Sequence, residues 1–151
     1  MVRWGLVFFS LCLFVGHLWA APIDIRSDRM EVLEDEKLAV FTGHVEAKKG
    51  DLKLWSNRLY VYYEIRKGRR EVKKLIALGE VRIEKGRWRA LSGKAVYFKD
   101  EDRLVLEDNP RVWHGKDEVR GAIVVIYFKE NRSEVLSSGN GRVEAYVYTE
   151  D

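Results

Sequence analysis

The side chains that could carry out acid–base or metal chemistry are few and scattered along this sequence. Beyond residue 20 the histidines are His44 and His114, and neither has a further metal ligand at a suitable spacing around it. Asp100, Glu101 and Asp102 form a run of carboxylates, but such a run between two apolar segments is typical of a solvated turn. The sequence contains no nucleophile motif, phosphate-binding glycine loop or glycosidase-like carboxylate pair. It therefore predicts a protein that is not an enzyme and that has no metal site and no cofactor.

The remaining reactive or charged groups support this interpretation. Cys12 is the only cysteine and lies in the apolar N-terminal segment, so we expect no disulfide and no zinc–thiolate site in the rest of the chain. Lys67, Arg69 and Arg70 surround Gly68 in a predicted hairpin, where they could contact phosphate or simply form an exposed basic turn. A net charge of +3 over 151 residues is too even a balance to indicate a nucleic-acid partner.

The N-terminus has the three parts of a secretory signal peptide. Arg3 supplies a positive charge, residues 4–19 are almost entirely apolar, and Ala20 and Ala21 are small residues suited to cleavage. We therefore predict a cleaved signal over residues 1–20 and a single domain over residues 21–151 of an exported protein. A retained membrane anchor is the alternative, although the apolar stretch is short for a bilayer span of about 20 residues.

After residue 20 the sequence alternates apolar and polar residues in short runs that end at turn signals. In the run from Gly43 to Gly50, for example, Val45 and Ala47 alternate with polar residues. No segment after residue 20 shows a convincing helical pattern. Alternation of this kind buries one face of each strand, so the sequence predicts an all-β fold.

The runs also repeat. Gly43–Gly50 matches Gly79–Gly86, and the period of the repeats is roughly 30 to 36 residues, which is long enough for about four strands. In each copy the alternation slips by one position at a small residue, namely Ser27, Ser56, Ser92 or Gly121. Such a slip marks a bulge or a corner. We expect an elongated antiparallel sheet that is folded over at these corners around a continuous apolar interior.

Three segments resemble the LptA (OstA-type) family of periplasmic lipopolysaccharide transport proteins. They are Pro22–Asp28, Phe41–Tyr62 and Asn109–Gly121, and the resemblance extends from Pro22 to Val147. It implies a twisted, open-ended β-jelly roll in the periplasm of a Gram-negative bacterium, with a role in outer-membrane assembly.

The resemblance also implies that the apolar interior binds the acyl chains of lipid A. The inward alternating positions would line this groove, and Ile23 and Tyr97 match lipid-facing positions of the family pattern. A closed core is the simpler interpretation of the same residues. The predicted groove residues are Ile23, Ile25, Met30, Phe41, Val45, Leu54, Leu59, Val81, Ile83, Ala95, Tyr97, Val119, Val124 and Ile126.

Head-to-tail assembly into a bridge between the inner and outer membranes is a further implication of the resemblance. The two terminal strands would be open edges able to pair with a partner strand. We expect an inner-membrane-anchored partner at the first edge, and another copy or an outer-membrane β-barrel translocon at the last. The edge residues are Ile23, Asp24, Ile25, Arg26 and Ser27 at the first, and Val143, Glu144, Ala145, Tyr146 and Val147 at the last.

The sequence alone leaves three other kinds of protein as alternatives. An anchored inner-membrane relative (LptC-like) would share the fold and keep its N-terminal helix. A structural β-repeat protein would have a sealed core. A jelly-roll enzyme or a carbohydrate-binding module would need a cluster of polar residues on the inward face, where the alternation places mostly aliphatic ones.

Overall fold

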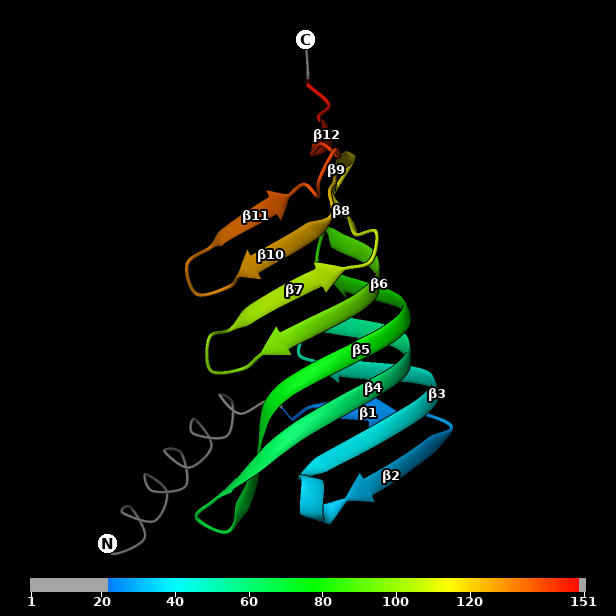
Figure 1. Cartoon of the computed structure of the whole chain (residues 1–151), viewed down its shortest axis with the longest axis vertical. Coiled ribbons are helices and arrows are strands. Elements are labelled where there is room, and N and C mark those ends of the chain that lie inside the picture. Colours follow the sequence, from blue (N-terminus) through cyan, green and yellow to red (C-terminus); the bar gives the residue numbers. More distant parts are fainter. Residues whose placement is uncertain (1–21, 150–151) are drawn as a thin grey trace, which may run out of the picture.

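The computed structural model describes residues 22–149, whose strands form one continuous antiparallel sheet (Figure 1). The predicted signal peptide and its cleavage point lie outside the described residues. No helix within residues 22–149 is long and apolar enough to cross a membrane. The strands are β1 (Asp24–Arg26), β2 (Arg29–Leu33), β3 (Leu38–Lys49), β4 (Leu52–Arg66), β5 (Arg69–Lys85), β6 (Trp88–Phe98), β7 (Arg103–Glu107), β8 (Arg111–His114), β9 (Asp117–Arg120), β10 (Ile123–Tyr127), β11 (Arg132–Leu136) and β12 (Glu144–Tyr146), with a 3₁₀ turn at Glu34–Glu36.

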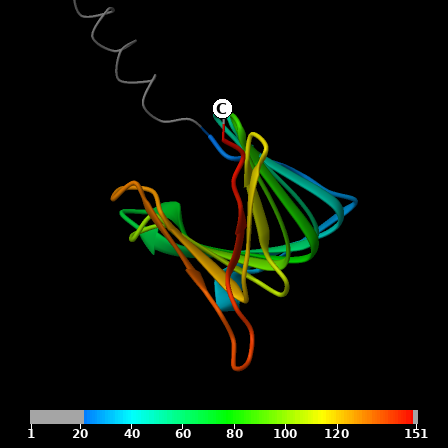
Figure 2. The ribbon, with the colours of Figure 1, turned by 90° about the horizontal axis from the view of Figure 1, so that it is seen from above.

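The sheet is folded into two arms that meet at a corner (Figure 2). The long strands β3 to β6 run through the corner and contribute to both arms, whereas each short strand belongs to one arm. We call the arm that contains β1, β8, β9 and β12 the first arm, and the arm that contains β2, β7, β10 and β11 the second arm. The predicted folded-over, open-ended antiparallel sheet is therefore confirmed.

The corner lies where the alternation slips. The pairing register shifts between Thr42 and Val45, between Trp55 and Arg58, and between Leu78 and Val81. A bulge bends a strand without ending its hydrogen-bond ladder. Segments that the sequence predicts as separate short strands are therefore joined through the corner in the long bent strands β3 to β6. The corner serines make the same bond in successive copies. The hydroxyl of Ser27 donates to the carbonyl of Arg29 at 2.9 Å, that of Ser56 to Arg58 at 2.9 Å, and that of Ser92 to Lys94 at 3.1 Å.

Close backbone approach at the corner explains its glycines. Gly79 has a φ of +82°, and a Cβ built on it would lie 3.0 Å from the Cβ of Asn57 on the next strand. A Cβ on Gly93 would lie 2.8 Å from the Cβ of Asp108, closer than real Cβ atoms come. In both places a neighbouring side chain packs directly over the glycine, from β4 at Asn57 and from the segment after β7 at Asp108, so a larger residue would push the two segments apart.

Candidate functional site

The inner face of each arm carries an uninterrupted apolar row that crosses the whole sheet. Residues paired in register on adjacent strands share a face, so the pairing defines each row directly. In the first arm the row is Ile25, Ala47, Leu54, Ile83, Ala90, Val112, Val119 and Ala145. In the second arm it is Met30, Phe41, Leu59, Ala77, Ala95, Leu106, Val124 and Val135.

The structure brings the predicted groove residues together on this inner face. Ile25, Leu54, Tyr97 and Ile126 pack against the central apolar cluster, to which Phe41, Val45, Leu59, Val81, Ile83, Ala95 and Val124 belong. Met30 pairs with Phe41 and Val119 with Val112, so they share the same face. Ile23 lies two residues before Ile25, ahead of the first strand, and is half-buried.

Burial divides the inner face into a corner half and a rim half. Near the corner, Val45, Leu59 and Val81 are each only 1% exposed, and residues of both arms belong to one cluster. Toward the open side, Leu54 and Tyr97 are half-buried. The inner face is therefore most deeply buried at the corner. Farther from the corner, partly exposed side chains such as Leu54 and Tyr97 stand beside buried ones such as Ile83 and Leu104.

Several buried inward residues are absent from the sequence prediction. Leu104 and Leu106 follow the same alternation as the predicted set, and Leu106 is fully buried, so the period-two pattern could have found them. Ala47, Ala77 and Ala90 are also buried. Alanine gives a weak sequence signal because it is common in every kind of element, so alternation suggests an inward position for Ala47 and the pairing register establishes it for all three.

Aromatic and charged side chains from both arms lie at the open side of the folded sheet, which would be the mouth of the predicted groove. Tyr97 donates its hydroxyl to the Asp102 carboxylate at 2.5 Å, so Asp102 is a structural partner as well as a turn residue. Burial, together with this hydrogen bond, raises the pKa of the Tyr97 hydroxyl above its usual value. The ring of Phe128 lies 6.4 Å from that of Tyr97 in an edge-on arrangement. Opposite them, the Lys85 ammonium reaches across from the first arm to within 5.3 Å of the Phe128 ring centre.

Trp88 also lies at the mouth. It occupies the inward position that pairs with His114, and the two ring centres are 4.5 Å apart. Its side chain is 51% exposed, so this inward aromatic belongs to the rim and not to the core.

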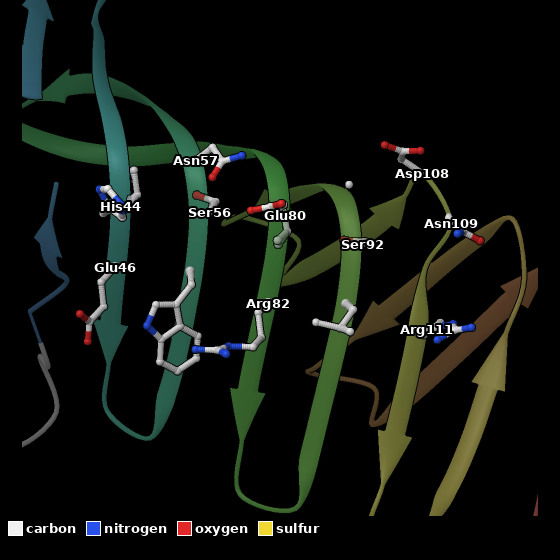
Figure 3. Close-up of a pocket in the computed structure, with 15 residues that line it drawn as sticks. His44, Glu46, Ser56, Asn57, Glu80, Arg82, Ser92, Asp108, Asn109 and Arg111 are labelled. Carbon is white, nitrogen blue, oxygen red and sulfur yellow. The ribbon is translucent and has the colours of Figure 1, made fainter. Parts of the chain in front are cut away.

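The opposite face of the first arm has different chemistry. Where this outer face meets the corner, a shallow depression is lined by Glu46, Trp55, Arg82 and Arg111, among others (Figure 3). The Arg82 guanidinium lies 4.2 Å above the Trp55 ring centre, and both side chains come from paired positions of β4 and β5. Charges of both signs are mixed over this surface, in contrast to the apolar rows on the inner face.

His44 and the basic turn around Gly68, both candidate sites in the sequence, have partners within the protein. His44 donates a 2.7 Å hydrogen bond from Nδ1 to the Asp28 carboxylate, and this bond raises the pKa of His44. Arg70 of the basic turn forms a 2.8 Å ion pair with Glu34 and stacks over Tyr63. Within the described part of the chain, no three His, Cys, Asp or Glu side chains gather as a metal site.

The ends of the sheet lie where the terminal strands were expected. Among residues 22–149, strand β1 pairs only with β3 and β12 pairs only with β9, so each leaves one side open to the rest of the described chain. The residues Ile23, Ser27, Val143 and Val147 of the predicted edges flank these two strands. At each end of the sheet the two arms have separate edge strands. The prediction did not include the edge strands of the second arm, which are β2 at the first end and β11 at the last.

Comparisons with known proteins agree with this geometry. Residues 24–132 match the family described as the LptA/(LptD N-terminal domain) LPS transport protein family. An uncharacterized protein of Rhizobium meliloti (strain 1021) is 23% identical over 129 residues, which cover 82% of this chain and 69% of that protein. The crystal structure of LptH, the LptA-homologous periplasmic component of the lipopolysaccharide transport device of Pseudomonas aeruginosa, superposes with a TM-score of 0.75 at 18% identity. That superposition covers 85% of this chain and 96% of LptH, and it confirms the predicted β-jelly-roll fold.

Proposed function

We propose, from the premise that this chain belongs to the LptA/LptD N-terminal-domain family of lipopolysaccharide transport proteins, that its inner face carries the acyl chains of lipid A through the periplasm. The match covers residues 24–132, which include β1 to β10 and the start of β11. The family consists of transport proteins, in keeping with an interior made of apolar side chains.

The observation that carries the proposal is an inner face that is apolar from one end of the sheet to the other. Its side chains are buried at the corner, and apolar side chains such as Leu54 and Tyr97 are only half-buried farther from it. Each buried methylene of an acyl chain contributes about 0.8 kcal/mol, so ten buried methylenes contribute on the order of 8 kcal/mol. Half-buried apolar side chains that recur from strand to strand would let an acyl chain move along the sheet without entering water. Apolar burial is non-directional, which suits a carrier that must hold its cargo and also release it.

Site-specific photo-crosslinking tests this proposal. Tyr97 and Val96 are neighbours on β6, both half-buried, and they face opposite sides of the sheet because side chains alternate along a strand. A photoreactive residue at Tyr97 should crosslink to lipopolysaccharide in cells, and the same residue at Val96 should not. Equal crosslinking at the two positions, or none at either in a correctly folded protein, would contradict the proposal.

We also propose that the protein acts as part of a bridge between the two membranes. The unpaired outer sides of β1 and β12 are supporting features, because an open strand edge pairs readily with a strand of another chain. In this arrangement the first edge receives an inner-membrane-anchored partner, and the last edge receives another copy or an outer-membrane partner.

Amide hydrogen exchange at increasing protein concentration tests self-association. Protection should rise at β1, β2, β11 and β12 and stay constant in the central strand β5. Unchanged exchange at both ends at every concentration would remove the head-to-tail contact from the proposal while leaving lipid binding intact. N-terminal sequencing of the exported protein would show a start at Ala21 if the signal is cleaved as predicted, and an intact N-terminus would favour the anchored relative.

A further inference from the structure

Lys85 is a charged residue at an inward-facing position of the first arm. It pairs in register with Leu52 on one side and with Trp88 on the other, and Leu52 packs against the central apolar cluster. Cross-strand partners share a face, so the Lys85 side chain starts from the inner surface at the rim. The same row also includes Lys49, which pairs with Leu52, so two ammonium groups belong to the rim of this arm.

The Lys85 ammonium contacts an aromatic ring of the opposite arm. It lies 5.3 Å from the centre of the Phe128 ring, within the range of a cation–π contact. In the described part of the chain, residues 22–149, no carboxylate lies within 4.0 Å of its Nζ atom. A lysine that reaches over the mouth to a neutral ring is therefore available to a stronger anionic partner.

The Phe128 side of this contact is fixed more firmly than the Lys85 side. Phe128 donates its backbone N–H to the carbonyl of Asp102 at 3.1 Å, and its ring packs edge-on against Tyr97. Tyr97 is in turn held by its hydrogen bond to the Asp102 carboxylate. Lys85, in contrast, has a flexible four-carbon stem at the end of β5. Of the two partners, Lys85 is the one that can move.

We propose that Lys85 and Phe128 form a gate across the mouth of the groove, and that a phosphate group on an acylated lipid opens it by binding the Lys85 ammonium. This inference rests on the proposed function and identifies the part of the lipid that the rim recognises. An ammonium–phosphate contact is a charge-assisted hydrogen bond and is stronger than the contact with a neutral ring. The Asp102 carboxylate on the second arm would repel phosphate, so the headgroup lies on the side of Lys85 and Lys49.

Binding measurements with two matched lipids test the gate. The probes are purified lipid A, an acylated disaccharide with phosphate groups, and the same lipid after removal of its phosphates. Lys85→Met keeps most of the apolar stem and removes the charge. Its affinity for the phosphorylated lipid should fall about tenfold, the loss of one charge-assisted hydrogen bond, and its affinity for the dephosphorylated lipid should stay within about twofold. Lys85→Arg should retain most of the affinity for both.

Lys53→Met is the matched control, because Lys53 lies on the outer face of the same arm and pairs with Glu84, and it should bind both lipids as the wild type does. Phe128→Leu should speed the entry of both lipids because it removes the ring that holds Lys85. Equal losses for the two lipids in Lys85→Met, or no loss for either, would overturn the gate while leaving the carrier function in place. A wild-type protein that binds neither lipid would instead refute the proposed function itself.

Discussion

The replacement of Gly93 by alanine tests the physical basis of the corner. Gly93 lies on β6 beside Asp108, and its N–H donates to the Asp108 carbonyl at 2.9 Å. An alanine Cβ at this position would lie 2.5 Å from the Asp108 Cγ and 2.8 Å from its Cβ. The carboxylate can rotate away from the new methyl group, but the Cβ of Asp108 cannot, because it is fixed by a backbone held in the hydrogen bond.

The expected cost follows from these contacts. Forcing one extra methyl group into a closely packed site costs about 1–3 kcal/mol. Lengthening the hydrogen bond between Gly93 and Asp108 adds about 1 kcal/mol. Gly93→Ala should therefore lower the free energy of unfolding by about 2–4 kcal/mol, a large fraction of the stability of a protein of this size.

Urea unfolding followed by tryptophan fluorescence measures this difference. Gly50→Ala is the control, since a Cβ there would meet nothing within 4 Å and only the φ of +60° opposes alanine, at about 1 kcal/mol. Asp108 has a φ of +64°, which glycine adopts freely, so Asp108→Gly in the Gly93→Ala background should recover most of the loss. If Gly93→Ala costs no more than Gly50→Ala, or if the second change restores nothing, close packing at the corner is not what holds the sheet folded over.

Three further predictions concern the core, the corner hydroxyls and pH. Leu106→Ala should lower the free energy of unfolding by about 2–5 kcal/mol, because Leu106 is fully buried and its removal leaves a cavity; a smaller loss in urea unfolding would mean that the arms can collapse onto the gap. Ser56→Ala should cost about 1 kcal/mol through its lost bond to the Arg58 carbonyl, measured in the same assay, and no loss would mean that water replaces the hydroxyl. Because Asp28 raises the pKa of His44, the stabilisation from their pair should be complete below pH 6.5 and disappear as the pH rises through the raised pKa. An NMR titration should show the His44 midpoint fall toward 6.5 in Asp28→Asn, and an unchanged midpoint would show that another group controls it.

The fold could be predicted from the sequence because its determinants are local. The alternation identifies the inward face residue by residue, and the slips at Ser56 and Ser92 place the corner where the register shifts. Alternation does not show whether a strand ends or bends at a slip. That outcome depends on contacts such as the one between Asn57 and Gly79, which lie on different strands and far apart in the sequence.

The mouth of the groove could not be predicted in the same way. Lys85 and Phe128 belong to opposite arms. Lys85 ends β5 and Phe128 follows β10, and these two strands do not pair with each other. Their contact depends on the angle between the arms, which no repeating pattern specifies. Alternation places Lys85 on the inward face of its own strand, and the pairing register then puts it beside Leu52 and Trp88. A lysine at an inward position is a sequence sign that the rim has a special role.

The division of the inner face into corner and rim separates stability from binding in a way that mutations can distinguish. Val45, Leu59 and Val81 are almost inaccessible, so a lipid could reach them only by forcing apart side chains that hold the two arms together. Leu54 and Tyr97 are half-buried already, so an acyl chain can cover them with little change to the protein. Leu59→Ala should therefore lower the free energy of unfolding and affect lipid binding only through folding, whereas Leu54→Ala should weaken lipid binding at small cost to stability. If the two variants changed stability and binding in the same proportion, the inner face would act as one continuous surface, and the lipid would occupy the corner as well as the mouth.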